Sequence, residues 1–495
     1  MNLIDNFLDR ITMYRLVLYF LIIFVVIAFA LSFFGVLPFF PYEIIFSVFF
    51  LISICWISNK IFTSVLKVPA NIESVYITAL ILALIVTPSF SFRSFALLGS
   101  VGVLSMASKY ILAINRKHIF NPAAIAVVLT PIIIGQYASW WVGNAWMMPF
   151  VVLGGLLIVK KIQREDLLFS FLATAAIVVL GFAYFNHGDL IGSLKTIFFQ
   201  SALFFLAFIM LTEPLTTPPS KAWRILYGIL VGMGVIYLTP EIALVLGNIF
   251  SYLVSPKQKL LLTLKKKLKI GPDILDFTFN PDKKIDFVPG QYLEWTLPHD
   301  KSDSRGNRRY FTIASSPTEN ILKLGIKLYS NGSSFKKALA NLDHKTPLAG
   351  AQLAGTFILP GDVSKKIVFI AGGIGITPYR SMTKYLLDKG EKRDIILLYS
   401  NKFASEIMYT DVWNQAFSSL GIKTVYTLTG EIPAGWKGKI GRIDAKMIKE
   451  EVLDWKERLF YLSGPHAMVS GFEQTLKSMG ISSDQVKIDF FPGYV

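Results

Sequence analysis

The sequence predicts a chain of two unlike parts: a polytopic α-helical membrane domain of about ten helices, then a β-barrel followed by an α/β domain. The 495 residues have a mean hydropathy of +0.52 and are 14% aromatic, which is too apolar for a soluble protein of this length. The apolar residues are concentrated between Tyr14 and Val254, whereas the composition from Lys257 onward is that of an ordinary soluble domain. The predicted domains are residues 1–255, 257–360 and 361–495.

A spanning helix needs about 20 mostly apolar residues. Ten candidate segments lie near residues 14–36, 42–62, 73–89, 94–114, 121–136, 146–161, 167–185, 195–213, 222–239 and 241–254. The first is too long for a signal peptide and lacks a small-residue cleavage site. An even number of crossings is compatible with the charges, because alternate loops hold most of the lysines and arginines.

The loops predicted to be cytoplasmic carry Lys60, Lys67, Arg116, Lys117, Lys160, Lys161, Arg164, Lys221 and Arg224, and the outer loops keep only Arg93 and Lys195. By the positive-inside rule, we expect a multi-pass protein of the cell membrane, in contact with the lipid bilayer, with both termini cytoplasmic. The net charge of +16 then reflects membrane orientation and the binding of anionic cofactors, and we expect no nucleic acid partner.

Cys55 is the only cysteine and lies in an apolar segment, where a small buried side chain is expected. One cysteine excludes a disulfide within the chain, a four-cysteine iron–sulfur cluster and a zinc site built on cysteines. We expect no metal site.

Two polar motifs interrupt the apolar half. In HIFNPAA (118–124), Asn121 and Pro122 suit the N-cap and first position of a helix. In MLTEPLTTPPS (210–220), prolines end a helix and leave Glu213, Thr216 and Thr217 beside freed backbone groups. Either motif alone is explained as helix punctuation. Together they indicate a ligand site at membrane depth, which would take a flavin such as FMN or a quinone head group.

These motifs resemble the family that contains the B subunit of the sodium-pumping NADH:quinone oxidoreductase and the D subunit of the Rnf complex. The resemblance covers about residues 1–255 and implies ten helices and bound flavin, including an FMN esterified to a threonine in an S-G-A-T-type motif. The nearest stretch, DLIGSLKT at 189–196, departs from that motif, which leaves covalent attachment open.

The soluble half begins with strand-like alternation around a Gly-Pro turn in residues 259–279. The strand RRYFTIASSP (308–317) then places Arg309, Phe311, Thr312 and Ser315 at spacings that let a guanidinium hold a pyrophosphate while a hydroxyl meets a flavin ring. An ordinary barrel strand with incidental polar residues is the alternative.

Further along, AGGIGITPYRSM (371–382) follows a short apolar run and opens a helix. Glycine lets backbone N–H groups approach a phosphate, and a helix N-terminus favours negative charge. Alone, this stretch is equally an ordinary strand-to-helix turn. The remaining motifs are IKLYSNGSSF (326–335), LAGTFILP (353–360), IILLYSN (395–401) and YLSGPHAMV (461–469).

This ordered set resembles the ferredoxin–NADP reductase superfamily over about residues 257–495, and implies a ferredoxin-reductase-like fold in which a β-barrel binds FAD and an α/β domain binds NADH or NADPH. The resemblance implies that Gly332, Ser333 and Ser334 help hold the FAD diphosphate. It implies that the pyridine nucleotide is seated by Gly372, Gly373, Gly375, Thr377 and Pro378, with Gly464, Pro465 and Met468 on the nicotinamide side. It also implies catalytic positions at Thr312 and Ser463. Many relatives have cysteine at the position of Ser463. The terminal aromatic residues Phe491 and Tyr494 would cover the flavin ring.

The expected function is a membrane flavoprotein oxidoreductase that passes electrons from cytoplasmic NAD(P)H through FAD to a flavin or quinone acceptor in the membrane domain. Redox-driven ion translocation is an alternative, with Glu213 and Glu241 as candidate carriers. A haem reductase needs paired histidines, and only His118 and His187 lie in the apolar half, at opposite predicted surfaces. An inactive scaffold conflicts with the intact glycine motifs.

The choice between NADH and NADPH stays open. YSNKFASEIMY (399–409) offers Lys402 for a 2′-phosphate and Glu406 as a ribose partner.

Overall fold

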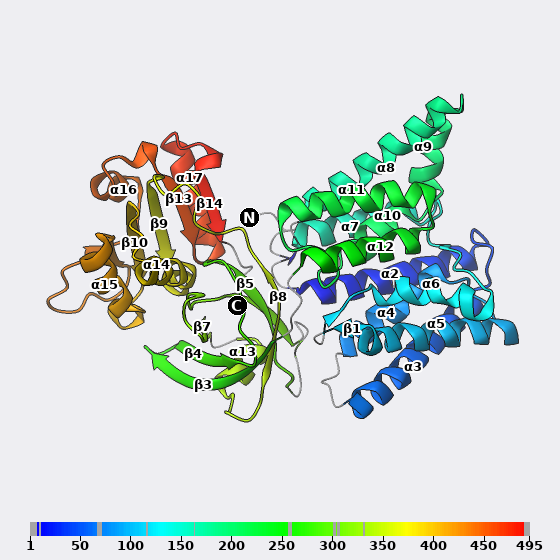
Figure 1. The fold of residues 1–495 in the computed structure, drawn as a ribbon, viewed down its shortest axis with the longest axis horizontal. Coiled ribbons are helices and arrows are strands. Elements are labelled where there is room, and N and C mark those ends of the chain that lie inside the picture. The colour runs from blue at the N-terminus through cyan, green and yellow to red at the C-terminus, as the bar shows by residue number, and fades with distance from the viewer. Residues whose placement is uncertain are drawn as a thin grey trace. The chain divides into compact units, whose positions relative to one another are not determined.

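The structure is a computed structural model, which describes residues 7–8, 11–66, 72–114, 117–162, 164–255, 260–299, 303, 307–329 and 332–489. The chain divides into two compact units, Met1–Lys259 and Leu260–Val495 (Figure 1). Each unit is described by itself.

The first unit is helical, and each of the ten predicted apolar segments contains a helix. The helices are α2 (Met13–Phe33), α3 (Pro41–Leu66), α4 (Ile72–Ile85), α5 (Phe92–Ile111), α6 (Pro122–Ile134), α7 (Met148–Ile162), α8 (Glu165–Phe185), α9 (Leu190–Phe199), α10 (Leu203–Phe205) with the π-helical turn η1 (Leu206–Met210), α11 (Lys221–Tyr237) and α12 (Pro240–Val254). A small hairpin, β1 (Ala113–Ile114) and β2 (Lys117–His118), precedes α6.

The expected count of ten membrane spans is not supported. Within the described residues, four helices are long and apolar enough to cross a membrane: α2, α3, residues Ser94–Ile111 of α5, and α8. A fifth span results only if α9 and the α10–η1 segment, bent by 54°, count as one. In the other apolar segments the helices are shorter than 18 residues, because apolar residues continue past the helix ends. For example, α6 ends before Gly135, which has a φ of 65°.

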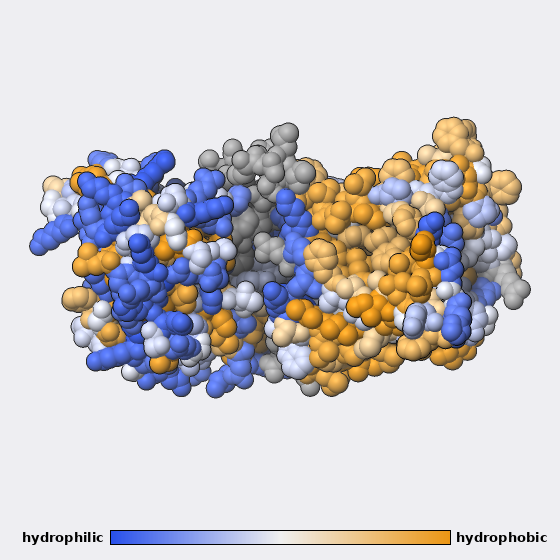
Figure 2. Space-filling model, turned by 90° about the horizontal axis from the view of Figure 1, so that it is seen from above, coloured by the Kyte–Doolittle hydropathy of each residue, from blue (hydrophilic) through white to orange (hydrophobic). Residues whose placement is uncertain are grey.

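On the face shown in Figure 2, the helical unit is largely apolar, whereas the second unit is largely hydrophilic. Phe49 on α3 and Phe169 and Ile177 on α8 are each at least 66% exposed. A soluble monomer rarely exposes so much contiguous apolar surface. The first unit is therefore suited to contact with lipid.

The second unit begins with an antiparallel barrel sheet in the order β6-β5-β8-β3-β4-β7. Its strands are β3 (Leu260–Ile270), β4 (Ile274–Pro281), β5 (Tyr292–Thr296), β6 (Arg308–Thr312), β7 (Leu322–Lys327) and β8 (Leu348–Ala354), with the helix α13 (Ser334–Ala340) between β7 and β8. The predicted Gly-Pro turn joins β3 to β4, and Gly271 has a φ of 67°, a left-handed conformation that suits glycine.

A parallel sheet follows in the order β12-β11-β10-β9-β13-β14. Its strands are β9 (Ile367–Gly372), β10 (Ile395–Asn401), β11 (Lys423–Leu428), β12 (Lys439–Ile440), β13 (Leu459–Ser463) and β14 (Val486–Asp489), and its main helices are α14 (Thr377–Lys389), α15 (Thr410–Leu420), α16 (Ala445–Glu451) and α17 (His466–Ser478). Along β9, Phe369 packs in the cluster with α14 and α15, while Val368 and Ile370 pack in the cluster with α16 and α17. Both faces of the strand are therefore buried, as its continuous apolar run predicts.

The strand order reverses between β9 and β13. In open α/β sheets, ligands bind beyond the carboxyl ends of the strands at such a reversal. The fold therefore directs attention to the turns that follow β9 and β13.

Candidate functional site

The two glycine turns at the reversal contact each other through their backbones. A Cβ on Gly375 would overlap the carbonyl oxygen of Ser463, and a Cβ on Gly464 would lie 3.3 Å from the Cα of Gly372. The neighbouring turn by itself therefore calls for glycine at position 375, and the approach of a phosphate to this turn stays a prediction. The structure thus brings Gly372, Gly375 and Gly464 together from segments about 90 residues apart in the chain.

The other predicted nucleotide residues lie at the same edge. A Cβ on Gly372 would overlap the Sδ of Met468 and lie 3.3 Å from the Cδ of Pro465. Gly373 has a φ of 53° and open space where a side chain would be. At the start of α14, the Thr377 hydroxyl donates to the carbonyl of Ile374 at 3.2 Å. Pro378 occupies the first turn, where its missing N–H costs no hydrogen bond.

On the barrel, Arg309 and Phe311 of β6 meet the start of α13. The Cζ of Arg309 lies 5.3 Å from the centre of the Phe335 ring, and the ring of Phe311 lies 6.0 Å from it. The Asp303 carboxylate lies beside both groups: Oδ1 is 3.8 Å from Nη2 of Arg309, and Oδ2 accepts the N–H of Ser334 at 2.9 Å. Arginine and the helix start thus already hold an anion between them.

The remaining predicted diphosphate residues are engaged within this loop. The Ser333 hydroxyl accepts the N–H of Lys336 at 3.3 Å and so caps α13. The Ser334 hydroxyl accepts the N–H of Asp303 at 2.9 Å. At Gly332, a Cβ would lie 2.9 Å from the Tyr329 carbonyl oxygen.

Ser315 lies in the core between the two sheets of this unit. Its hydroxyl accepts the N–H of Lys323 at 3.1 Å, and its carbonyl accepts the hydroxyl of Ser381 at 2.6 Å. It therefore links the barrel to α14.

Thr312 and Ser463 converge on a carboxyl that the sequence did not single out. The hydroxyl of Thr312 donates to Oδ2 of Asp489 at 3.3 Å, and that of Ser463 donates to the same oxygen at 3.4 Å. Asp489 ends β14 in register with Ser463. Burial raises the pKa of Asp489 from 3.8 to about 7, although the two hydroxyl hydrogen bonds oppose the shift.

The sequence analysis did not single out Asp489, and the only local signal for it is a carboxylate that directly follows the short apolar–charged–apolar stretch VKI (486–488). Phe491 and Tyr494, the predicted flavin cover, lie outside the described residues.

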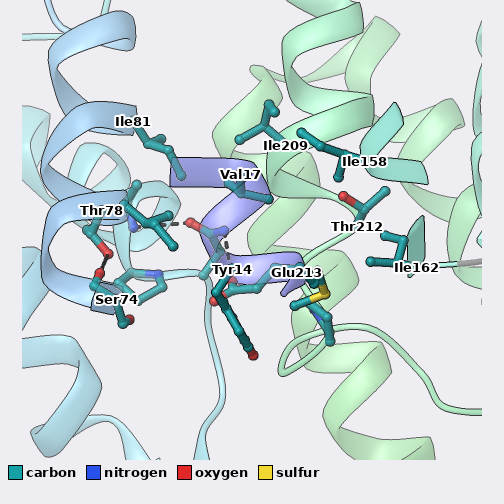
Figure 3. Close-up of a pocket in the computed structure, with 16 residues that line it drawn as sticks. Tyr14, Val17, Ser74, Thr78, Ile81, Ile158, Ile162, Ile209, Thr212 and Glu213 are labelled. Carbon is teal, nitrogen blue, oxygen red and sulfur yellow. Dashed lines mark hydrogen bonds between the residues drawn. The ribbon is translucent and has the colours of Figure 1, made fainter. Parts of the chain in front are cut away.

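A separate pocket lies within the helical unit. Figure 3 shows Ser74, Thr78 and Ile81 of α4 on one side and Ile158, Ile209 and Thr212 on the other, with Tyr14 and Val17 of α2 between them. Asn121, Pro122 and Glu213 also line it. The walls are therefore mostly apolar, with isoleucine the commonest lining residue, and they carry a few polar groups, as small-molecule pockets usually do.

The polar groups of this pocket are tied together. Asn121 Nδ2 donates to Oε2 of Glu213 at 2.9 Å, and Oε1 of Glu213 lies 3.8 Å from Nε2 of His118. The backbone N–H of Asn121 donates to Oδ1 of Asn248 at 2.8 Å. The two motifs predicted to converge therefore do so at Glu213.

Two details differ from the sequence prediction. Asn121 Oδ1 accepts the N–H groups of Ala123 and Ala124, each at 3.1 Å, so these two donors at the helix start are already used and are not free for a ligand. The hydroxyl of Thr216 donates to Oε2 of Glu213 at 3.2 Å, and the hydroxyl of Thr217 donates to the backbone carbonyl of Glu213 at 2.6 Å. Neither threonine is among the described residues that line the pocket. Thr216 and Thr217 therefore stabilise the turn that follows Glu213, whereas Thr212 and Glu213 of the same motif line the pocket.

Two known protein families match the second unit. Residues 261–350 match the model of the Oxidoreductase FAD-binding domain, and residues 369–474 match that of the Oxidoreductase NAD-binding domain. The C-terminal half therefore carries an oxidoreductase FAD-binding domain followed by an oxidoreductase NAD-binding domain. Both matches lie in this half, and the resemblance of residues 1–255 to the Rnf D and NADH:quinone oxidoreductase B subunits stays a prediction.

Individual relatives agree with this class. The chain is 25% identical over 235 residues to a flavohemoprotein of Oceanobacillus iheyensis, covering 46% of this chain and 57% of that protein. It is 26% identical over 217 residues to an NADPH oxidoreductase of Mycobacterium tuberculosis, covering 42% of this chain and 53% of that protein. The matched part thus spans a little over half the length of each relative.

Among solved structures, the cytochrome b5 reductase domain of the Ulva prolifera nitrate reductase is 23% identical, with a TM-score of 0.42, covering 48% of this chain and 98% of that domain. A TM-score this low adds nothing to the assignment, which rests on the two family models.

Proposed function

We propose that the chain is a membrane flavoprotein oxidoreductase that passes electrons from NAD(P)H, through FAD, to a flavin or quinone acceptor held by the helical unit. One observation carries the proposal. Ser463, at the edge where the two glycine turns meet, is linked through Asp489 to Thr312 on the barrel. The position implied for the nicotinamide and the position implied for the flavin thus share one buried carboxyl.

The residues present fit FAD at the barrel. Arg309 and the N–H of Ser334 hold the Asp303 carboxylate, and the same donors would hold the FAD diphosphate in its place. When bound, FAD supplies a ring that takes a hydride from the nicotinamide and releases electrons singly. Phe311 would lie against the ring, while Gly372, Gly373 and Gly464 would let the nucleotide approach the backbone.

The chain's own contribution at the reacting edge is orientation and proton handling. The hydroxyls of Thr312 and Ser463 both point at Asp489 Oδ2 and fix its place. Because its pKa lies near 7, Asp489 can hold or release a proton at neutral pH. Its burial excludes bulk water from that exchange.

In the helical unit, the acceptor would bind in the pocket lined by Asn121, Thr212 and Glu213. A quinone head group or a flavin ring binds through hydrogen bonds to its oxygens and through apolar contacts with its ring, and the pocket offers both kinds of group. The phosphate of FMN has no such support at the start of α6, since Asn121 caps those N–H groups itself. This favours a quinone or another uncharged ring. By charge asymmetry, the site faces the cytoplasm, with both termini on that side.

Coupled ion movement is the second candidate function. The carboxylate of Glu241, buried at the start of α12, accepts the indole N–H of Trp140 at 2.8 Å. A buried carboxylate in a membrane unit is a candidate for ion transfer. Ion flux in sealed vesicles during NAD(P)H oxidation would support it, and oxidation without flux would exclude it.

Purification of the full-length protein in detergent tests the reductase assignment. We expect noncovalent FAD whose absorbance is bleached by NADPH or NADH under anaerobic conditions. Arg309→Ala should lose most of the flavin, whereas Arg308→Ala, whose side chain pairs with Glu294 at 3.8 Å, should retain it. Full flavin occupancy in Arg309→Ala contradicts the assignment of β6.

The acceptor pocket is tested with matched threonines. Thr212 and Thr130 each donate to the carbonyl four residues earlier at 2.7 Å, and only Thr212 lines the pocket. Thr212→Val and Asn121→Ala should leave FAD reduction fast and slow its reoxidation by an added quinone. Thr130→Val should change neither rate. Unchanged reoxidation in both pocket variants would place the acceptor elsewhere.

A further inference from the structure

We infer that the physiological nucleotide is NADPH, and that Lys402 selects it by binding the 2′-phosphate. This inference deepens the proposed function, because it rests on the NAD(P)H site at the sheet reversal. It resolves the choice between Lys402 and Glu406 that the sequence left open.

The location follows from the sheet. β10 lies directly beside β9, with Ser400 in register with Gly372, so residues 401 and 402 extend past the carboxyl edge where the glycine turn begins. In nucleotide-binding α/β folds, the adenosine ribose lies at the end of this second strand. An acidic residue there bonds the 2′-hydroxyl of NADH, and a basic residue accommodates the 2′-phosphate of NADPH.

Glu406, the only acidic residue in 399–409, is committed elsewhere. It is 3% exposed, and its Oε1 pairs with Nζ of Lys327 on barrel strand β7 at 2.6 Å. Its Oε2 accepts the backbone N–H of Lys402 at 3.3 Å. Both carboxylate oxygens therefore serve the protein. Turning one toward a ribose would leave the Lys327 ammonium without this buried partner.

Lys402 has the opposite character. Its side chain is exposed, and its ammonium lies over the ring of Phe403, 5.0 Å from the ring centre. Its backbone is held on both sides, since its carbonyl accepts the N–H of Gly430 at 3.0 Å. A Cβ on Gly430 would lie 2.6 Å from that carbonyl oxygen, so only glycine allows the turn to close there.

Glu406 is therefore a positioning residue in this site. Lys327 fixes Glu406, Glu406 fixes the backbone of Lys402, and the lysine side chain reaches into solvent. A lysine on a fixed backbone presents a mobile point charge, which suits a doubly charged phosphate.

Steady-state kinetics of the full-length protein in detergent, with ferricyanide as acceptor, test the selection. Wild type should use NADPH with a higher kcat/KM than NADH. Lys402→Ala should lower kcat/KM for NADPH about tenfold, through KM, because it removes one charged hydrogen bond to phosphate. It should leave the values for NADH unchanged. Lys446→Ala on α16, which removes a lysine side chain that is 83% exposed, is the matched control and should change neither.

A binding measurement separates this inference from the proposed function. Adenosine 2′,5′-bisphosphate should bind wild type more tightly than 5′-AMP by calorimetry, and Lys402→Ala should abolish the difference. This readout needs no electron transfer. If neither NADPH nor NADH bleaches the flavin, the proposed function fails while the binding result still reports on Lys402.

Two results would overturn the inference. One is a preference of wild type for NADH. The other is a Glu406→Gln variant that raises KM for NADH alone, which is expected if Glu406 bonds the ribose. We expect Glu406→Gln to weaken NADPH more, because it loosens the backbone of Lys402.

Discussion

The raised pKa of the Asp489 carboxyl comes from its surroundings in the fold and not from its neighbours in the sequence. Thr312 and Ser463, which belong to different sheets, both donate to its Oδ2. The surrounding protein excludes water, so the charged form is disfavoured and the pKa rises to about 7. At neutral pH, the group is therefore close to half-protonated.

The raised pKa predicts a pH-dependent stability. Between pH 3.8, the ordinary value, and about 7, the folded state holds a proton on Asp489 that the unfolded state has released. Its contribution to the free energy of unfolding therefore falls as pH rises through this window and is constant above it. Melting temperatures from pH 5 to 8 should fall for wild type relative to Asp489→Asn, whose amide does not titrate.

The comparison with Asp489→Asn isolates this group, because all other titrations are common to both proteins. Parallel melting curves for the two proteins across this pH range would show that Asp489 keeps an ordinary pKa.

Among the elements, the paired glycine turns after β9 and β13 are the most constrained. A Cβ on Gly464 would lie in tight contact with the Cα of Gly372, 3.3 Å away, and a Cβ on Gly375 would overlap the Ser463 carbonyl. These contacts hold the edge of β9 against that of β13. Because the turns support each other, a substitution in one displaces both.

Gly375→Ala should therefore destabilise the protein by about 1–3 kcal/mol through overpacking and reduce nucleotide use. Gly471→Ala, inside α17 with open space at its Cβ, is the control. It should stabilise by about 0.5–1 kcal/mol, since alanine loses less backbone freedom than glycine in a helix. Thermal unfolding and NADPH kinetics measure both. A neutral Gly375→Ala would mean that the turns are not in contact.

At the scale of the whole molecule, charged groups join the barrel to the parallel sheet within the second unit. Arg380 of α14 pairs with Glu319 and donates to the carbonyl of Ala314 at 3.1 Å. Tyr409 donates to Oδ1 of Asp276 on β4 at 2.8 Å. The two sheets should consequently unfold together.

Glu319→Gln is expected to destabilise this unit by about 3–5 kcal/mol, because it leaves the buried Arg380 guanidinium without its ionic partner. The exposed pair of Lys446 and Glu450, 3.9 Å apart, is the control, and Glu450→Gln should cost less than about 1 kcal/mol. Denaturant unfolding followed by flavin fluorescence gives both values. Equal effects would indicate that the Arg380 pair is solvated.

The membrane topology gives a further prediction. Four candidate spans are an even number, so both termini should lie in the cytoplasm if the bent segment Leu190–Met210 re-enters without crossing. If it crosses as a fifth span, a shorter helix such as α12 must cross too for the termini to share a side. Fluorescent-protein fusions at each end, with protease protection in sealed vesicles, test this. A protected terminus at one end only would contradict it.

The sequence by itself determined what depends on neighbouring residues. Strand alternation located β3 and β4, glycine and proline located the turn before α14, and apolar runs located the described helices from α2 to α12. The ordered motifs were sufficient to indicate the FAD-binding and NAD-binding domains, which the family models confirm. These features were predictable because backbone propensity and burial periodicity act over a few residues.

Only the tertiary structure decided what depends on contacts between distant segments. Nothing near Asp489 in the chain indicates that Thr312 and Ser463 meet it, and nothing near Glu406 indicates its pairing with Lys327. The number of candidate spans also fell, because apolar residues pack in loops as well as in helices. Burial and pairing set the chemistry of a side chain, and both arise only when remote parts of the chain pack together.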